Sequence, residues 1–100
     1  MAQGPKGYVI LTEAIKDPEG MKAYAQAAGA AMGGVNVLAV DTAPTVLEGG
    51  WHGDQTVVLE FESVDAARAW YESEAYQKAA KLRQAAADCN AVILSGFDRP

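Results

Sequence analysis

The sequence predicts an α+β domain with the element order β-α-β-β-α-β. Four segments rich in β-branched and aromatic side chains alternate with alanine-rich segments that follow helix-capping residues. The predicted strands are residues 7–15, 35–40, 55–62 and 89–97. This order defines a ferredoxin-like sandwich, in which a four-stranded antiparallel sheet carries its helices on one face.

Length and composition favour a single domain. We expect one domain over residues 1–100, with its core at about 6–97, because 100 residues are too few for a TIM barrel or a doubly wound sheet. Half of the residues are apolar, which excludes a disordered chain. Twenty of them are alanine, so the predicted core is thin.

The first helix is predicted from its boundary residues. Asp17 is a preferred N-cap residue, and Pro18 suits the first helical position, where the missing N–H has no intrahelical partner. The helix should therefore begin at Pro18. It should end near Gly33 and Gly34, since glycine readily takes the left-handed conformation of a helix C-cap.

Turn signals separate the second and third strands. Residues 41–44 form a break, and residues 45–48 resume an extended pattern. Glycines on both sides of Trp51 and His52 predict a turn or hairpin tip before the third strand.

The second helical region carries two serines of the N-cap type. Ser63 precedes a helix that runs through Tyr71, and Ser73 precedes a longer stretch over 75–87. The pattern predicts either one helix kinked near Ser73 or two helices in sequence. The last strand then closes the domain, and residues 98–100 should form a frayed tail.

Charge and cysteine content exclude several classes of protein. Thirteen acidic against eight basic residues give a net charge of −5 and a pI near 4.6, which argues against binding to nucleic acid or to a membrane. The chain has no membrane span, and its first six residues lack the features of a signal peptide, so we expect a soluble, cytoplasmic protein. His52 and Cys89 are isolated in sequence, so no metal site, internal disulfide or cofactor is expected.

Apolar side chains on both faces of the predicted sheet indicate a partner. In the first strand, Tyr8 and Ile10 point to one face, while Val9 and Leu11 point to the other. The second strand is expected to divide its apolar side chains in the same way: Val35, Val37 and Ala39 against Leu38 and Val40. Because the helices cover only one face, we expect a homodimer in which a second copy covers the other.

A run of aromatic residues resembles a known family. Trp70-Tyr71-x-Ser73-x-x-Tyr76 leading to Arg83, together with shorter matches, resembles the domain of unknown function 1330 family over residues 6–97. The family is similar to the dimeric α+β barrel superfamily, which includes cofactor-independent monooxygenases, isomerases, haem-degrading enzymes and stress-induced binding proteins. The resemblance therefore implies the ferredoxin-like fold and a dimer, but no particular reaction.

The residues best suited to ligand binding lie on the second helical region. Tyr76 and Arg83 are two helical turns apart and share one face, where a guanidinium and a phenol could hold a carboxylate. The alternative is an ion pair between Arg83 and Glu48 that fastens the helix to the sheet. Trp70 and Trp51 could stack on a flat ligand or serve as core and interface anchors.

His52 is the single histidine, and histidine is the residue type whose unperturbed pKa lies near neutrality. As a general base it could be oriented by Glu48, which makes these two residues the catalytic candidates. The alternative is a solvent-exposed histidine in a turn.

Two classes of function stay open at this point. The first is a homodimer that binds a small apolar or carboxylate-bearing metabolite, with or without cofactor-independent acid–base activity of the isomerase or monooxygenase kind. The second is a non-catalytic structural or regulatory interaction module whose cleft is filled by its own side chains.

Overall fold

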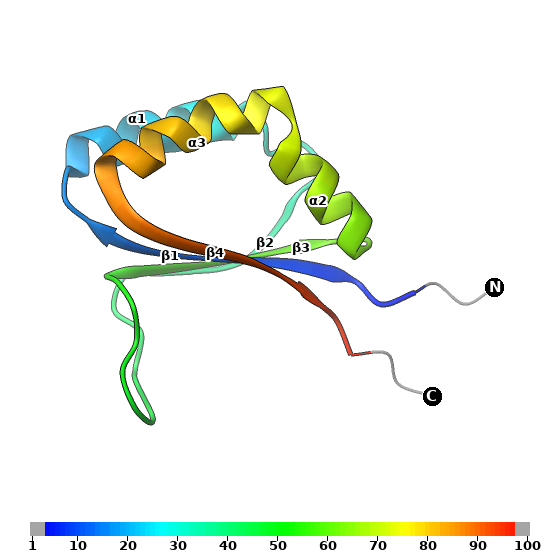
Figure 1. Ribbon diagram of the computed structural model, residues 1–100, viewed down its shortest axis with the longest axis horizontal. Helices are drawn as coiled ribbons and strands as arrows, with labels where there is room; N and C mark the ends of the chain where they lie inside the picture. Colours follow the sequence, from blue (N-terminus) through cyan, green and yellow to red (C-terminus); the bar gives the residue numbers. More distant parts are fainter. Residues whose placement is uncertain (1–3, 98–100) are drawn as a thin grey trace.

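The computed structural model describes residues 4–97 as an antiparallel sheet with helices on one face (Figure 1). The elements are β1 (Gly7–Ile15), α1 (Pro18–Gly29), β2 (Asn36–Asp41), β3 (Gln55–Phe61), α2 (Val64–Glu72), α3 (Glu74–Ala86) and β4 (Ala87–Ser95). The sheet order is β2-β3-β1-β4, so the first strand lies between the third and the last. The predicted ferredoxin-like α+β fold is confirmed, and the predicted tail at 98–100 lies outside the described residues.

The serine caps divide the second helical region into two helices. The hydroxyl of Ser63 accepts a hydrogen bond from the Ala66 amide at 3.0 Å, and that of Ser73 accepts one from the Tyr76 amide at 3.2 Å. Ser73 is extended, with ψ of 147°, which ends α2 and begins α3. Of the two sequence-based alternatives, two helices in succession is therefore correct.

Helix α1 begins at the predicted residue but ends earlier than expected. Asp17 occupies the N-cap position without a hydrogen bond from its side chain to the helix. The helix ends at Gly29, and its C-cap Ala30 stays right-handed. Gly34 does take a positive φ of 81°, but in the turn that leads to β2.

The segment between β2 and β3 contains no additional strand. Residues 45–48, expected to be extended, belong to a long loop and form no strand of the sheet. We call residues 42–54 the arm. Figure 1 shows that the arm projects from the sheet on the side opposite the helices.

A β-bulge changes which residues of β2 face the helices. Val37 pairs with Leu59, but the next aligned pair is Ala39 with Val58, so the register shifts at Leu38. Residues directly opposite in a pair of strands share a face. Val37 therefore faces the helices while Ala39 faces away, which corrects the predicted alternation.

The core consists of two small clusters. Between the sheet and α2 the buried side chains are Val9, Leu11, Leu59, Phe61 and Ala67. Between α1 and α3 they are Ala28, Tyr76, Ala79 and Ala80. Because alanine allows two helices to approach closely, α1 packs mainly on α3 and touches the sheet little. The side chains under these two helices are described below.

None of the helices within residues 4–97 is long and apolar enough to cross a membrane.

Candidate functional site

Five polar or aromatic side chains gather between the sheet and the pair α1 and α3. They come from four elements: Glu13 of β1, Tyr24 of α1, Gln55 of β3, and Tyr76 and Arg83 of α3. We call this group the buried polar cluster. Its members form two linked groups, Glu13 with Gln55, and Tyr24 with Tyr76 and Arg83.

Glu13 enters the interior because of strand alternation. It lies on the same face of β1 as Val9 and Leu11, and its side chain is fully buried. Gln55 is its partner across β1 and β3, and the amide of Gln55 donates to Glu13 Oε1 at 2.6 Å. The other carboxylate oxygen, Oε2, is buried without a hydrogen-bond partner. One oxygen of this carboxylate is therefore fixed, while the second can still accept a hydrogen bond.

Tyr76 and Arg83 share the buried face of α3, as their spacing predicts. The hydroxyl of Tyr76 lies 2.8 Å from that of Tyr24, and the Arg83 guanidinium carbon lies 5.9 Å from the centre of the Tyr24 ring. Burial, followed by the hydrogen bond to Tyr76, raises the pKa of Tyr24 far above its usual range. Tyr24 therefore keeps its proton at neutral pH.

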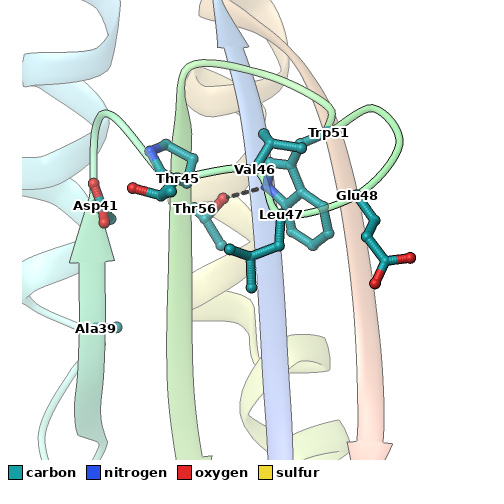
Figure 2. A pocket seen from close by; sticks show the side chains of 9 residues that line it. Ala39, Asp41, Thr45, Val46, Leu47, Glu48, Trp51 and Thr56 are labelled. Carbon is teal, nitrogen blue, oxygen red and sulfur yellow. Dashed lines mark hydrogen bonds between the residues drawn. The ribbon is translucent and has the colours of Figure 1, made fainter.

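Arg83 lies beside the side chains of Tyr76 and Cys89, yet two of its guanidinium nitrogens have no hydrogen-bond partner. It is 1% exposed, and both Nε and Nη2 are buried without a hydrogen-bond partner. A guanidinium stays charged in proteins, and leaving its N–H groups unpaired in the interior carries a free-energy cost. Within residues 4–97 Arg83 forms no ion pair, so the alternative pairing with Glu48 is wrong. Glu48 lies in the arm, on the other side of the sheet (Figure 2).

A groove of about 340 Å³ leads from the surface toward this cluster. Its lining residues are Ile15, Pro18, Met21, Lys22, Tyr24, Ala25 and Gln55. Tyr24 and Gln55 belong to the buried polar cluster, and the Tyr24 ring also contacts Arg83. The Tyr24 side chain therefore separates the groove from the guanidinium.

Trp70 supports the cluster from the α2 side. Its indole N–H donates to the Ala31 carbonyl at 2.8 Å, so this polar group is already paired. Its ring lies 4.0 Å from that of Tyr76 and 5.2 Å from that of Phe61, measured between centroids. Trp70 therefore fixes the position of Tyr76 and fills space beside the cluster.

The remaining predicted site residues lie on the helix-free face of the sheet. His52 Nδ1 is 2.7 Å from the Thr12 hydroxyl, and its Nε2 is 3.5 Å from an oxygen of Asp88. His52 is thus half-buried against the sheet rather than a free turn histidine. The sheet separates it, with Glu48 and Trp51, from Tyr76 and Arg83. The sequence-predicted residues fall into two groups.

The arm encloses a second and larger hollow, which we call the arm pocket. It measures about 490 Å³, and Figure 2 shows its lining: Ala39, Asp41, Pro44, Thr45, Val46, Leu47, Glu48, Trp51 and Thr56. Its polar groups are mostly engaged, since the Trp51 indole donates to Thr56 at 2.8 Å and Asp41 accepts from the Ala43 amide at 2.8 Å. Size alone favours this pocket as a ligand site, whereas unsatisfied polar chemistry favours the buried polar cluster.

Residues 4–97 hold no group of three histidine, cysteine, aspartate or glutamate side chains that could bind a metal ion.

Sequence reasoning missed Glu13 and Gln55, and it did not include Tyr24 among the site residues, although helical spacing predicts that Tyr24 faces inward. The sequence does contain a signal for Glu13, because this charged residue falls on the same face as Val9 and Leu11 in a mostly apolar strand. A carboxylate at an inward position is rare unless it is paired or functional. The link from Glu13 to Gln55 depends on strand register and could not be found in this way.

The solved structures that resemble this one define the class of fold. A protein of unknown function from Rhodopseudomonas palustris is 24% identical, with a TM-score of 0.68, and the match covers 98% of this chain and 86% of that one. A dimeric ferredoxin-like protein of unknown function from Thermobifida fusca is 16% identical, with a TM-score of 0.64 and coverage of 95% and 94%. A Caulobacter crescentus protein, provisionally described as an antibiotic biosynthesis monooxygenase, is 12% identical, with a TM-score of 0.62 and coverage of 96% and 93%. This chain is therefore a ferredoxin-like α+β protein.

The family is identified more narrowly by the sequence. The family model for the domain of unknown function DUF1330 matches residues 6–97. The chain belongs to the DUF1330 family, and the predicted resemblance is confirmed. No protein with a curated description matches the sequence.

The hydrogen bond between Tyr24 and Tyr76 predicts energetic coupling. Tyr24→Phe and Tyr76→Phe should each lower the free energy of unfolding by about 1–2 kcal/mol, because each leaves a buried hydroxyl unpaired. The double variant should lose less than the sum, with a coupling of about 1 kcal/mol measured by urea denaturation. Tyr71→Phe is the matched control, and strictly additive losses would contradict the shared hydrogen bond.

Proposed function

We propose that this protein is a homodimer that binds a small carboxylate-bearing ligand at the buried polar cluster. The observation that carries the proposal is Arg83, which is buried with Nε and Nη2 unpartnered. Buried polar groups are almost always hydrogen-bonded, so an arginine in this state fits a site that a ligand completes. A planar guanidinium is well suited to a carboxylate because it can donate two parallel hydrogen bonds.

The neighbours of Arg83 suit a small ligand with an apolar body. The rings of Tyr24, Tyr76 and Trp70 supply aromatic walls, and the two tyrosine hydroxyls can donate or accept. The groove beside α1 supplies a path from solvent that ends at the Tyr24 ring. Entry requires this ring to swing away from Arg83. A ligand of one ring or a few carbon atoms is therefore the appropriate size.

Ligand binding is tested by thermal unfolding with benzoate, phenylacetate and pyruvate as probes. We expect at least one probe to raise the Tm of the wild type with increasing concentration, as mass action requires. Arg83→Lys keeps the charge but loses the planar fork, so it should weaken binding by about tenfold or more.

Arg68→Lys, on the exposed part of α2, is the matched control and should behave like the wild type. The ligand proposal fails if no carboxylate raises the Tm, or if Arg83→Lys responds as the wild type does. The non-catalytic module, with Trp70 and Tyr76 filling its own cleft, would then account better for the structure.

Acid–base activity is the reaction class that this cluster supports best. With a 2-keto acid held by Arg83, Glu13 would take a proton from the carbon next to the ketone. The C–H electron pair would form the C=C bond of an enolate while the C=O π electrons move to the carbonyl oxygen, which would accept a hydrogen bond from a tyrosine hydroxyl. Tyr24 is suited to this donor role because it stays protonated at neutral pH. The reaction needs no cofactor.

Proton exchange tests this activity. We expect the protein to accelerate exchange of the methyl protons of pyruvate in D₂O, followed by proton NMR, and Glu13→Gln to reduce the rate by about 100-fold or more. Glu62→Gln, just after the end of β3, is the control. Equal rates in the wild type and Glu13→Gln would remove Glu13 as the base.

The proposed homodimer rests on apolar side chains that the single chain leaves uncovered. On the helix-free face these are Tyr8, Ile10, Val58, Val92 and Leu94. Val92 and Leu94 are each 49% exposed, and Leu47 of the arm, which lies on the same side, is 89% exposed. A second copy placed sheet to sheet would cover them with an interface of the usual size, about 1,600 Å² in total.

The carboxylate of Glu60 on this face does not prevent a second copy from covering the sheet. Glu60 accepts hydrogen bonds from Asn36 at 2.9 Å and from Tyr8 at 3.1 Å, and these bonds lower its pKa. Its carboxylate is therefore already partnered within the chain. The Thermobifida fusca protein of the same fold is described as dimeric. The arm pocket would lie at such an interface, so we assign it to assembly rather than to ligand binding.

Assembly is tested by sedimentation equilibrium at low micromolar concentration. We expect a dimer for the wild type and a monomer for Leu94→Asp, because a buried, unpaired carboxylate would oppose association. Leu82→Asp, which replaces an exposed leucine of α3, should remain a dimer. A wild-type mass of 10.5 kDa would contradict the proposed assembly.

A further inference from the structure

We propose that the site prefers ligands that carry, beside their carboxylate, a hydroxyl or amino group that donates a hydrogen bond to Glu13; a 2-keto acid would instead present its acidic C–H to the same carboxylate. The preferred class is then a small hydroxy acid or amino acid rather than a simple carboxylic acid. This inference rests on the proposed function, since it concerns the same site. It comes from a different observation, the unpaired oxygen of Glu13.

The two oxygens of Glu13 are in different states. Oε1 is held by Gln55 at 2.6 Å, so the carboxylate has a fixed orientation. Oε2 is fully buried and has no donor among the described residues. A buried acceptor of this kind costs free energy unless something donates to it. The side chain is thus pre-oriented to accept one further hydrogen bond.

Glu13 and Arg83 belong to one enclosed region without contacting each other. Glu13 pairs across the sheet with Cys89, whose thiol lies 3.7 Å from the Arg83 carbonyl oxygen. Both side chains also act on the Tyr24 phenol, Arg83 lowering its pKa and Glu13 raising it. Within residues 4–97 no ion pair joins Glu13 to Arg83, so their charged groups are more than 4.0 Å apart. A ligand that touches both would satisfy the two unpaired groups together.

Electrostatics then selects between ligands. The carboxylate of a ligand held by Arg83 would be repelled by the nearby carboxylate of Glu13, most strongly in a site from which water is excluded. A hydroxyl or amino group on the ligand offsets this repulsion by donating to Oε2. An analogue without the donor leaves Oε2 unpaired and keeps the repulsion. Sites built to bind a hydroxyl discriminate strongly against analogues that lack it.

The experiment compares matched ligand pairs by isothermal titration calorimetry. The pairs are mandelate with phenylacetate, 3-hydroxybenzoate with benzoate, and lactate with propionate. For the wild type we expect the hydroxylated member of at least one pair to bind about tenfold more tightly or better. Glu13→Gln should abolish this preference, and it should bind the simple acid at least as tightly as the wild type, because the like charge is gone.

Two further variants complete the test. Glu13→Asp keeps the charge but shortens the reach, so it should lose the preference and still bind simple acids weakly. Glu62→Gln is the control and should retain the preference. If the Glu13 variants do not fold, the wild-type comparison still tests the inference, since the lack of any preference for the hydroxylated acid overturns it without a substitution.

The outcomes separate this inference from the proposed function. If simple and hydroxylated acids bind equally well in every pair, and binding requires Arg83, the inference is overturned while the proposed function stands. If the preference survives in Glu13→Gln, Glu13 is not the acceptor and the inference is again overturned. If no carboxylate binds at all, the proposed function fails first and the inference fails with it.

Discussion

The structure depends on the packing of two alanine-rich helices, α1 and α3, against each other above the sheet. Close packing at Ala28, Ala79 and Ala80 joins α1 to α3, and this leaves the space beneath the pair to longer side chains. Aromatic rings and the buried polar cluster fill that space instead of leucine or isoleucine. A thin aliphatic core and a charged interior are thus two results of the same packing, and the charged interior is what makes the site chemically distinctive.

The sheet divides the molecule into two surfaces with different chemistry. On the helix side, unpaired polar atoms of Arg83 and Glu13 are enclosed by apolar walls, which suits a small polar guest. On the opposite side, exposed aliphatic side chains and the arm form a broad apolar surface, which suits a large partner. Trp51 lies on the helix-free side of the sheet and Trp70 on the helix side. The chain passes from one side to the other between them, through β3 and into α2.

The sequence predicted the fold more completely than the site. Capping residues and strand alternation depend on near neighbours, which is why Pro18, Ser63 and Ser73 marked their helices correctly. The bulge at Leu38 and the direct passage from α3 into β4 at Ala87 depend on pairing between distant strands, so these boundaries were misplaced. Helical spacing brought Tyr76 and Arg83 together, whereas the nearness of Glu13 to them follows from tertiary packing alone.

The length of the junction between α3 and β4 sets both the orientation of Arg83 around the helix axis and the face of the sheet to which each side chain of β4 points. No loop intervenes, and the Ala86 carbonyl accepts hydrogen bonds at 2.9 Å from the amides of both Lys16 and Asp17, which anchors the junction to the end of β1. One residue added between Arg83 and Ala87 would either turn the guanidinium by about 100° around the helix axis or exchange the two sides of β4. An insertion or deletion at this point would therefore displace either the buried polar cluster or the exposed apolar face of the sheet, whereas a substitution that keeps the length would leave both in place.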